Sequence, residues 1–234
     1  MAPADTCLVY DLGTVAYSRS LELQQALKLA RGEHRVPDML LLLEHPPVLT
    51  VGRSGQPGDI LAPAESLDRE GITVLATDRG GRVTYHGPGQ LVAYPILDLR
   101  QRGLGVTEYV RLLEQTVVDL LGGFGITAGR FPGYPGVWVG GEKICALGIH
   151  IGHGITSHGF ALNVDPDLRH FAFINPCGIT GRGVTSMARL LGWGVTVAEV
   201  KAPLKESFGR VFGLRLEEGG AEELWSACCG TPAG

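Results

Sequence analysis

The sequence predicts one α/β domain in which helices pack on a mixed sheet. Two observations support this prediction. Short apolar or β-branched stretches of strand length alternate with amphipathic helical stretches, and turns rich in glycine or proline separate the strands. Strand pairs joined by tight turns, with helices inserted between other strands, are typical of a mixed sheet. We expect a single catalytic domain over 1–234, with a core of about 7–214 and a tail of no predicted role.

The first half of the chain is predicted to contain one helix among several strands. The helix is expected at 14–30, because Leu23, Leu27 and Ala30 recur on one face. Two adjacent prolines end the second strand, and glycine-rich turns separate the later ones. The expected strands are 7–12, 39–44, 48–51, 72–76, 83–86 and 91–97.

The second half is predicted to hold two helices around a hairpin. The helix at 108–121 has apolar residues at helical spacing and ends at two glycines. Gly140 and Gly141 form the turn of a hairpin between 137–139 and 143–151, and a strand at 155–164 follows. We expect a loop at 171–178. A capping box from Thr196 to Glu199 opens a helix that reaches about residue 212, although Pro203 indicates a kink or a different boundary.

The composition excludes several classes of protein. The formal net charge of -4 gives no general attraction to polyanions, so nucleic acid is not an expected partner. The five cysteines are odd in number and form no C-x-x-C pair, which is typical of reduced thiols and not of a secreted disulfide framework. No signal peptide is seen, and no apolar run reaches the ~20 residues of a membrane span. We therefore expect a cytoplasmic protein with no membrane partner.

Cys177 is the candidate nucleophile. It stands between Pro176 and Gly178, which places it in a turn where its sulfur is exposed, whereas a free cysteine is ordinarily buried and inert. A thiol with a pKa near 8.5 is only about 3% thiolate at pH 7, so catalysis requires a nearby cation or base.

Lys143 is the candidate cation, because it opens a strand directly after the Gly140–Gly141 turn. Strand alternation places it on the same face as Cys145 and Leu147. The alternative is a lysine at a strand end with its ammonium group in water, which is the usual case. Cys145 is either a second thiol near the site or a core residue.

Histidines offer another base and a weak case for a metal. His86 or His158 could form a Cys–His pair, although a histidine bonded to a backbone partner is more common. His150, His153 and His158 have no compact zinc-ligand spacing, and we expect no metal.

With these segments in place, the chain resembles the lipoyl(octanoyl) transferases, lipoate-biosynthesis enzymes that carry octanoate from acyl carrier protein to a lipoyl-domain lysine. Five stretches carry the resemblance in the family's order: Glu44-His45-Pro46-Pro47-Val48, Arg79-Gly80-Gly81-Arg82-Val83-Thr84-Tyr85-His86-Gly87-Pro88-Gly89-Gln90, Gly141-Glu142-Lys143-Ile144, His158-Gly159-Phe160-Ala161-Leu162-Asn163-Val164 and Ile174-Asn175-Pro176-Cys177-Gly178.

The resemblance implies a biotin/lipoate protein ligase-like fold of the class II synthetase type. It implies that Cys177 carries the acyl group as a thioester, that Lys143 lowers its pKa, and that no cofactor, ATP or metal is needed. The implied partners are octanoyl-acyl carrier protein and the lipoyl domains of 2-oxoacid dehydrogenase complexes and of the glycine cleavage H protein. We expect the enzyme to be a monomer. Substrate-pocket roles are implied for Arg79, Gly80, Gly81, Arg82, Val83, Thr84, Tyr85, His86, Ala146, Leu147, Gly148, Gly159, Phe160 and Ala161.

Three other functions remain open at this stage. An ATP-dependent lipoate-protein ligase would share the fold and need no nucleophilic cysteine. A non-catalytic lipid-binding or carrier-docking module would tolerate the loss of Cys177. A Cys–His hydrolase would release free octanoate and would depend on His86 or His158, with Lys143 dispensable.

Overall fold

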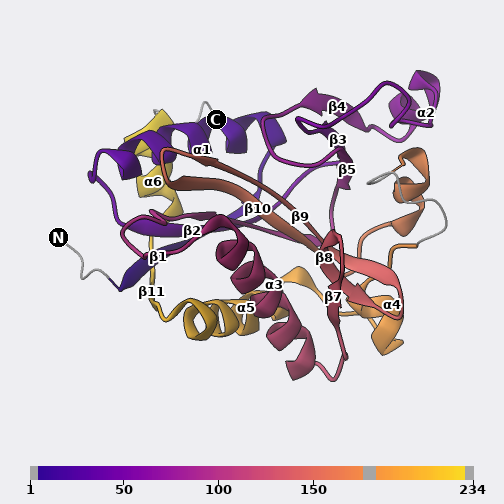
Figure 1. The fold of residues 1–234 in the computed structure, drawn as a ribbon. Coiled ribbons are helices and arrows are strands. Elements are labelled where there is room, and N and C mark those ends of the chain that lie inside the picture. Colours follow the sequence, from indigo (N-terminus) through magenta and orange to yellow (C-terminus); the bar gives the residue numbers. More distant parts are fainter. Residues whose placement is uncertain (1–4, 176–182, 230–234) are drawn as a thin grey trace.

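The computed structural model describes residues 5–175 and 183–229, and its centre is a mixed eight-stranded sheet (Figure 1). β1 runs parallel to both β2 and β11, while the pairs from β2 through β6, β10, β9 and β8 to β7 are antiparallel. The predicted mixed sheet is therefore confirmed. In spatial order the strands are β11 (Arg215–Glu218), β1 (Thr6–Thr14), β2 (Asp38–Glu44), β6 (Gln90–Ile96), β10 (Ile155–Asn163), β9 (Glu142–Gly152), β8 (Tyr134–Val139) and β7 (Gly129–Phe131).

A second sheet of three strands lies at one end of the first. β3 (Val48–Val51) is its central strand, parallel to β4 (Thr73–Ala76) and antiparallel to β5 (Val83–His86). The short helix α2 (Ala64–Arg69) lies beside this sheet in Figure 1. The sequence predicted these strands but not their separation into a sheet of their own, because strand patterns do not specify which strands pair.

Helices cover both faces of the large sheet. In Figure 1, α1 (Tyr17–Gly32) and α6 (Ala221–Cys229) lie on one side, and α3 (Val106–Gly123) and α5 (Val197–Phe212) lie on the other. The predicted capping box of α5 is present, and Pro203 lies inside the helix. No helix in the described parts of the chain has both the length and the apolar character needed to cross a membrane.

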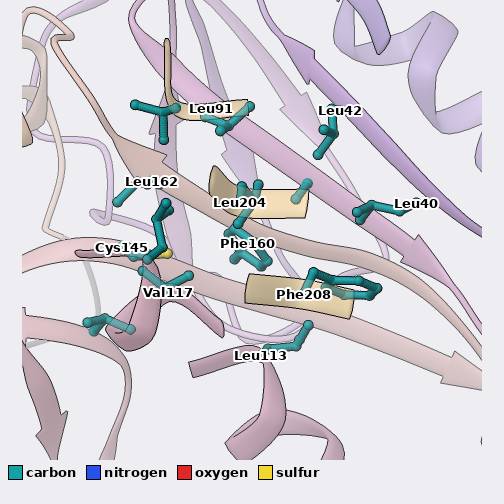
Figure 2. Close-up of a cluster of buried hydrophobic side chains, with 14 of the residues drawn as sticks. Leu40, Leu42, Leu91, Leu113, Val117, Cys145, Phe160, Leu162, Leu204 and Phe208 are labelled. Atoms are coloured by element: carbon teal, nitrogen blue, oxygen red, sulfur yellow. The ribbon is translucent and has the colours of Figure 1, made fainter. Parts of the chain in front are cut away.

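Two layers of apolar side chains join the helices to the sheet. Residues of β2 alternate between them, since Leu40 and Leu42 face α3 and α5 whereas Met39, Leu41 and Leu43 face α1. This explains why the strand is apolar throughout, as in a sheet buried on both faces. Figure 2 shows the α3–α5 layer, in which Leu113, Val117, Leu204 and Phe208 lie beside Phe160, Leu162 and Cys145.

The structure also departs from the sequence predictions at three places. The expected loop at 171–178 begins inside a 3₁₀ helix (Leu168–Phe173) that Asp167 caps. The short helix α4 (Met187–Leu191) follows Ser186, which caps it with its side chain. Beyond residue 214, where the sequence placed the end of the core, β11 pairs with β1 and Leu224 of α6 packs in the α1 layer. Each element is short, so its periodicity was too weak to reveal it.

Candidate functional site

A cavity of about 270 Å³ lies between the β9–β10 ladder of the large sheet and the turn that precedes β5. This volume is near the lower end for small-molecule pockets. Of the substrate residues that the resemblance implied, all but Tyr85 line it: Arg79, Gly80, Gly81, Arg82, Val83, Thr84, His86, Ala146, Leu147, Gly148, Gly159, Phe160 and Ala161. The fold thus gathers three distant sequence stretches around one space, and their contact with substrate stays a prediction.

Tyr85 lies outside this lining. Its hydroxyl group is 2.8 Å from Nδ1 of His170, and its ring packs against Phe171 with centroids 5.5 Å apart. Burial raises the pKa of Tyr85 to about 12, so its hydroxyl stays protonated at neutral pH. We assign Tyr85 to the core of the small sheet, because its side chain is enclosed there.

Close backbone approach explains the glycines of the cavity wall. The amide of Gly80 donates to the carbonyl of Ile149 at 2.8 Å, which joins the turn to β9. A Cβ on Gly148 would lie 3.0 Å from Cδ of Arg79, and one on Gly159 would lie 2.2 Å from the carbonyl oxygen of Ala93. A side chain at either position would push the turn or the neighbouring strand aside.

The two arginines of the turn are anchored to the protein. The guanidinium group of the buried Arg79 donates to Oγ1 and to the carbonyl of Thr50, and to the carbonyl of Arg82. Arg82 forms an ion pair with Asp59. Hydrogen bonding from Arg82 holds the pKa of the Asp59 carboxyl below its ordinary value. Both arginines therefore fix the shape of the turn, whatever else they contact.

Lys143 lines the cavity at the start of β9. Its backbone amide donates to the carbonyl of Gly183 at 3.0 Å, and its carbonyl accepts from the amide of Thr185 at 3.0 Å. Its Nζ lies 4.9 Å from the ring centroid of Trp138, a distance typical of a cation–π contact. The half-buried lysine thus packs against Trp138 in the cavity wall, and its role as the cation of the site stays a prediction.

Cys145, two residues further along β9, is a core residue. It is fully buried beside Leu162 and Val117 in the α3–α5 layer (Figure 2). Burial raises the pKa of its thiol far above the ordinary value. The interpretation of Cys145 as a second thiol of the site is therefore wrong, and its interpretation as a core residue is confirmed.

Cys177 lies outside the described residues, so its place beside Lys143 stays a prediction. Described residues on one side of it line the cavity, and Asn175 on the other side connects to the lining through the ion pair of Asp59 with Arg82. The amide of Asn175 donates to the carbonyl of Asp59 at 2.8 Å, and Gly183 and Val184 line the cavity.

His158 sits at a strained position of the cavity wall. It is 1% exposed, lies in the middle of β10 and has a φ of 56°, which is rare for a residue with a side chain. Its Nε2 donates to Oδ1 of Asp78 at 2.7 Å, and its Nδ1 lies 3.5 Å from the hydroxyl of Tyr17. Burial lowers its pKa even though Asp78 opposes this effect. The other oxygen of Asp78 is 2.5 Å from Nδ1 of His150.

His86 is buried and neutral. Its Nδ1 lies 3.2 Å from Oε1 of Gln90, whose amide nitrogen donates to Asn163 and to the carbonyl of Tyr85. Since the amide nitrogen of Gln90 makes these two bonds, Oε1 is the acceptor and Nδ1 of His86 carries the proton. Burial lowers the pKa of His86 well below its ordinary value.

Sequence reasoning missed four residues of this region. Tyr17 and Tyr94 line the cavity, and Nε2 of His45 lies 2.9 Å from the hydroxyl of Tyr94. Nδ1 of His45 donates to the carbonyl of Val15 at 2.6 Å, and burial lowers its pKa to about 4. The fourth residue that sequence reasoning missed is Asp78, the partner of His158 and His150. His45 stood within a stretch that carried the resemblance, but nothing in the sequence brought it to Tyr94.

The histidines do not gather into a metal site in the described part of the chain. There, no three histidine, cysteine, aspartate or glutamate side chains converge as ligands. His153 lies in the turn after β9, whereas His150 and His158 lie within strands. The φ of His153 is 51°.

Comparison with known proteins identifies the family. Residues 16–209 match the Lipoyl protein ligase A/B catalytic domain. The chain belongs to this family. The octanoyltransferase of Solibacter usitatus (strain Ellin6076) is 49% identical over 213 residues, which are 91% of this chain and 96% of that protein. The resemblance to the lipoyl(octanoyl) transferases and the assignment as an acyltransferase are thereby confirmed.

Solved structures support the same fold. A bipartite lipoate protein ligase of Thermoplasma acidophilum superposes with a TM-score of 0.71 at 17% identity, covering 94% of this chain and 90% of that one. Biotin protein ligase from Aquifex aeolicus superposes with a TM-score of 0.54 at 14% identity, covering 89% and 70%. The predicted biotin/lipoate protein ligase-like fold is confirmed.

Proposed function

We propose that this chain transfers an octanoyl group from acyl carrier protein to a lysine of a lipoyl domain, through a thioester on Cys177. Family membership and the Solibacter usitatus relative support octanoyl transfer. The observation that carries the proposal is the cavity itself, which is mainly apolar, holds Lys143 at the start of β9 and is walled by glycines. Apolar walls suit an alkyl chain, and a cation at the cavity suits an ionised thiol.

The first step is thioester exchange. The Cys177 thiolate attacks the acyl carbonyl, the carbon–sulfur bond to the carrier breaks, and the carrier thiolate takes up the proton that Cys177 released. Lys143 favours the ionised thiol, since a cation that lowers a thiol pKa by about 1.5 units raises its thiolate fraction roughly tenfold at pH 7.

The second step forms an amide. The lysine amine of the acceptor attacks the acyl group, a carbon–nitrogen bond forms and the bond to Cys177 breaks. The proton that the amine loses goes to the departing Cys177 thiolate. The exchange is nearly balanced and the amide is more stable than the thioester, so the sequence of steps runs without ATP.

The buried histidines argue against the Cys–His hydrolase. Burial lowers the pKa of both His86 and His158, which makes each a poor acceptor for a thiol proton. His158 in addition gives its Nε2 proton to Asp78 and holds a fixed orientation. Lys143 lines the same cavity and brings a cation, so we infer that it is the better partner for Cys177.

The proposed acceptors are the lipoyl domains of 2-oxoacid dehydrogenase complexes and the glycine cleavage H protein. We place the reaction in the cytoplasm and expect the enzyme to be a monomer.

A transfer assay without ATP tests the proposal. Octanoyl-acyl carrier protein and an isolated lipoyl domain are incubated with the enzyme. The mass of the lipoyl domain is then measured by intact mass spectrometry. We expect one octanoyl group per domain from the wild type and from Cys145→Ser, and none from Cys177→Ser. Transfer that requires ATP would identify a ligase, and release of free octanoate alone would identify a hydrolase.

A further inference from the structure

Lys143 reaches the cavity because β9 contains one extra residue near its start. In the β8–β9 ladder Val137 pairs with Cys145 and Trp138 pairs with Lys143, so Ile144 is an additional residue of β9 between the two pairs. Such a β-bulge changes the direction in which neighbouring side chains point. Ile144 and Cys145 are consecutive, yet both lie in the α3–α5 layer. The expectation that Lys143 and Cys145 share a face is therefore wrong, and Lys143 lines the cavity instead.

The residue opposite Lys143 in the ladder is Trp138, and side chains that face each other across a ladder are in contact. We propose that Trp138 is a positioning residue for the transfer reaction, which holds the ammonium group of Lys143 where the bulge directs it. The inference rests on the proposed function, because it assumes that this ammonium group assists the reaction.

A glycine of β8 makes room for the stem of Lys143. A Cβ on Gly136 would lie 3.3 Å from Cε and 3.5 Å from Cδ of Lys143, and 2.7 Å from the carbonyl oxygen of Cys145. Gly136 also has a φ of 131°, which residues with a side chain rarely adopt. The lysine stem therefore passes over Gly136, and its Nζ ends 4.9 Å from the ring centroid of Trp138.

The indole ring of Trp138 is fixed by the protein around it. The residue is 5% exposed, and its Nε1 donates to the carbonyl of Tyr134 at 3.2 Å. Its ring also packs against Phe131, with centroids 5.5 Å apart. An aromatic face attracts a cation, and a ring that is already fixed needs no further ordering to do so. Trp138 thus offers Lys143 a prepared surface.

A buried carboxylate of α3 anchors the same part of β8. Oε1 of Glu114 accepts from the amide of Gly136 at 3.0 Å, and Oε2 accepts from Nε of Arg130 at 2.9 Å. Glu114 is 6% exposed, and the ion pair with Arg130 compensates its buried charge. The strand that presents Gly136 and Trp138 to the lysine is therefore tied to a helix of the core.

The alternative is that Trp138 only fills space in the cavity wall. Replacing a space-filling tryptophan would change stability but would leave the surroundings of the Lys143 ammonium group without a systematic change. A positioning tryptophan makes a sharper prediction, because leucine is apolar but has no aromatic face, whereas phenylalanine keeps the face. The contrast between Trp138→Leu and Trp138→Phe therefore separates packing from cation binding.

The first measurement observes Lys143 directly and does not depend on the reaction. The lysines are reductively methylated with isotope-labelled methyl groups, and the NMR signal of Lys143 is assigned from its absence in Lys143→Met. An aromatic ring shifts the signal of a group above its face upfield. We expect the wild-type Lys143 signal upfield of those of Lys28, Lys201 and Lys205. It should join them in Trp138→Leu and keep most of its shift in Trp138→Phe.

The second measurement follows turnover and the reactive thiol. With octanoyl-acyl carrier protein and a lipoyl domain, we expect kcat to fall about tenfold in Trp138→Leu and KM to change less, because a displaced cation affects ionisation of the thiol more than binding. The pH profile of iodoacetamide labelling should shift to higher pH in this variant. Trp138→Phe should restore most of both properties.

Trp225→Leu is the matched control. Trp225 also has a cation above its ring, since the guanidinium carbon of Arg19 lies 5.2 Å from its centroid. It belongs to α6 and does not line the cavity, so its loss should leave the Lys143 signal, kcat and the labelling profile as in the wild type. Thermal unfolding identifies any variant that fails to fold.

A wild-type Lys143 signal that coincides with those of the other lysines overturns the inference, whichever variants fold. Equal effects of Trp138→Leu and Trp138→Phe do the same, as does a Lys143 signal that moves while kcat and the labelling profile stay unchanged. If the wild type transfers no octanoyl group, the proposed function fails. The Lys143 signal then still decides whether Trp138 holds the ammonium group.

Discussion

The two ends of the cavity differ in how their polar groups are held. At the start of β9, the side chain of Lys143 supplies a cation. The backbone of Lys143 is hydrogen-bonded to the backbone of Gly183 and of Thr185. At the level of Ile149 the cavity is lined by Tyr17, Tyr94 and His158, which we call the cavity floor. These residues are neutral, and their polar atoms are hydrogen-bonded to the surrounding protein. In the proposed function, the charged end stabilises the thiolate and the neutral end faces the apolar part of the acyl chain.

This difference shows how a single cavity can serve two purposes. A thiolate requires a nearby cation, whereas a methyl group at the end of an acyl chain requires a surface free of charge. In the proposed function, the β9–β10 ladder separates the two requirements, and its glycines let the Arg79 turn and β6 pack closely against it. Substitutions at each end should therefore affect different measurements.

Removing the cation should have the largest effect on catalysis. Lys143→Met keeps an apolar stem of similar length but loses the charge, and we expect kcat to fall at least a hundredfold while the pKa of the reactive thiol rises. The pH profile of iodoacetamide labelling reports that pKa. Lys205→Ala, which removes a surface ion pair with Glu218, serves as the control and should match the wild type. An unchanged labelling profile in Lys143→Met would show that Lys143 does not lower the pKa of the reactive thiol.

A methyl group between the two ends should disturb both. In Gly159→Ala, the new Cβ would meet the carbonyl of Ala93 at 2.2 Å, so β10 and β6 must separate. We expect a loss of roughly 3 kcal/mol in the free energy of unfolding, measured in urea, and a large loss of turnover. In the control Gly129→Ala the new Cβ meets nothing within 4 Å, so stability should stay close to the wild type. Equal stability of both variants would contradict the tight wall.

The buried histidines around the cavity should make stability depend on pH. Burial lowers the pKa of His45 to about 4, whereas the same group in the unfolded chain titrates near 6.5. Below pH 6.5 the unfolded state binds a proton that the folded state does not, so stability falls as the pH drops from 6.5 toward 4. The shift corresponds to about 3 kcal/mol for this one residue.

Urea unfolding at several pH values measures this dependence. His86 and His158 contribute in the same direction, because burial lowers the pKa of each. His45→Gln should be less stable than the wild type at pH 7 and show a shallower decline between pH 6.5 and 4. A decline as steep as that of the wild type would mean that His45 does not titrate as proposed.

The smallest effect is expected outside the cavity, at Cys145. Cys145→Ser buries a hydroxyl group in the α3–α5 layer and should lower the free energy of unfolding by about 1–3 kcal/mol. Activity per folded enzyme should remain close to that of the wild type, because the thiol is fully buried on the core side of β9. Thermal unfolding and kcat together check this, and an inactive but folded variant would show that the wrong thiol was chosen.

Much of the fold and part of the cavity wall were predictable from the sequence, because local patterns determine them. The hairpin of β8 and β9 follows from its glycine turn, and the helix α5 follows from the Thr196–Glu199 box. The resemblance of the Arg79–His86 stretch to the family predicted most of the residues that this stretch contributes to the cavity lining. The position of Tyr85 outside the lining was not predictable, because alternation along a four-residue strand does not say which face of the sheet encloses each side chain.

The floor was not predictable, because it depends on long-range contacts. Tyr17 comes from α1, Tyr94 from β6 and His158 from β10, and each ring is held by a partner from yet another segment. No spacing in the sequence brings these residues together. The left-handed backbone at His158 was equally hidden, since a histidine in an apolar, strand-like stretch gives no sign of it.

The central claim is that Cys177 carries the acyl group and that Lys143 makes it reactive. The most direct measurement incubates the wild type with octanoyl-acyl carrier protein alone and locates the acyl group by peptide mass spectrometry at neutral pH. We predict a hydroxylamine-sensitive octanoyl group on Cys177, formed without ATP and much more slowly in Lys143→Met. An acyl group on another residue, or none in the absence of ATP, would contradict the account.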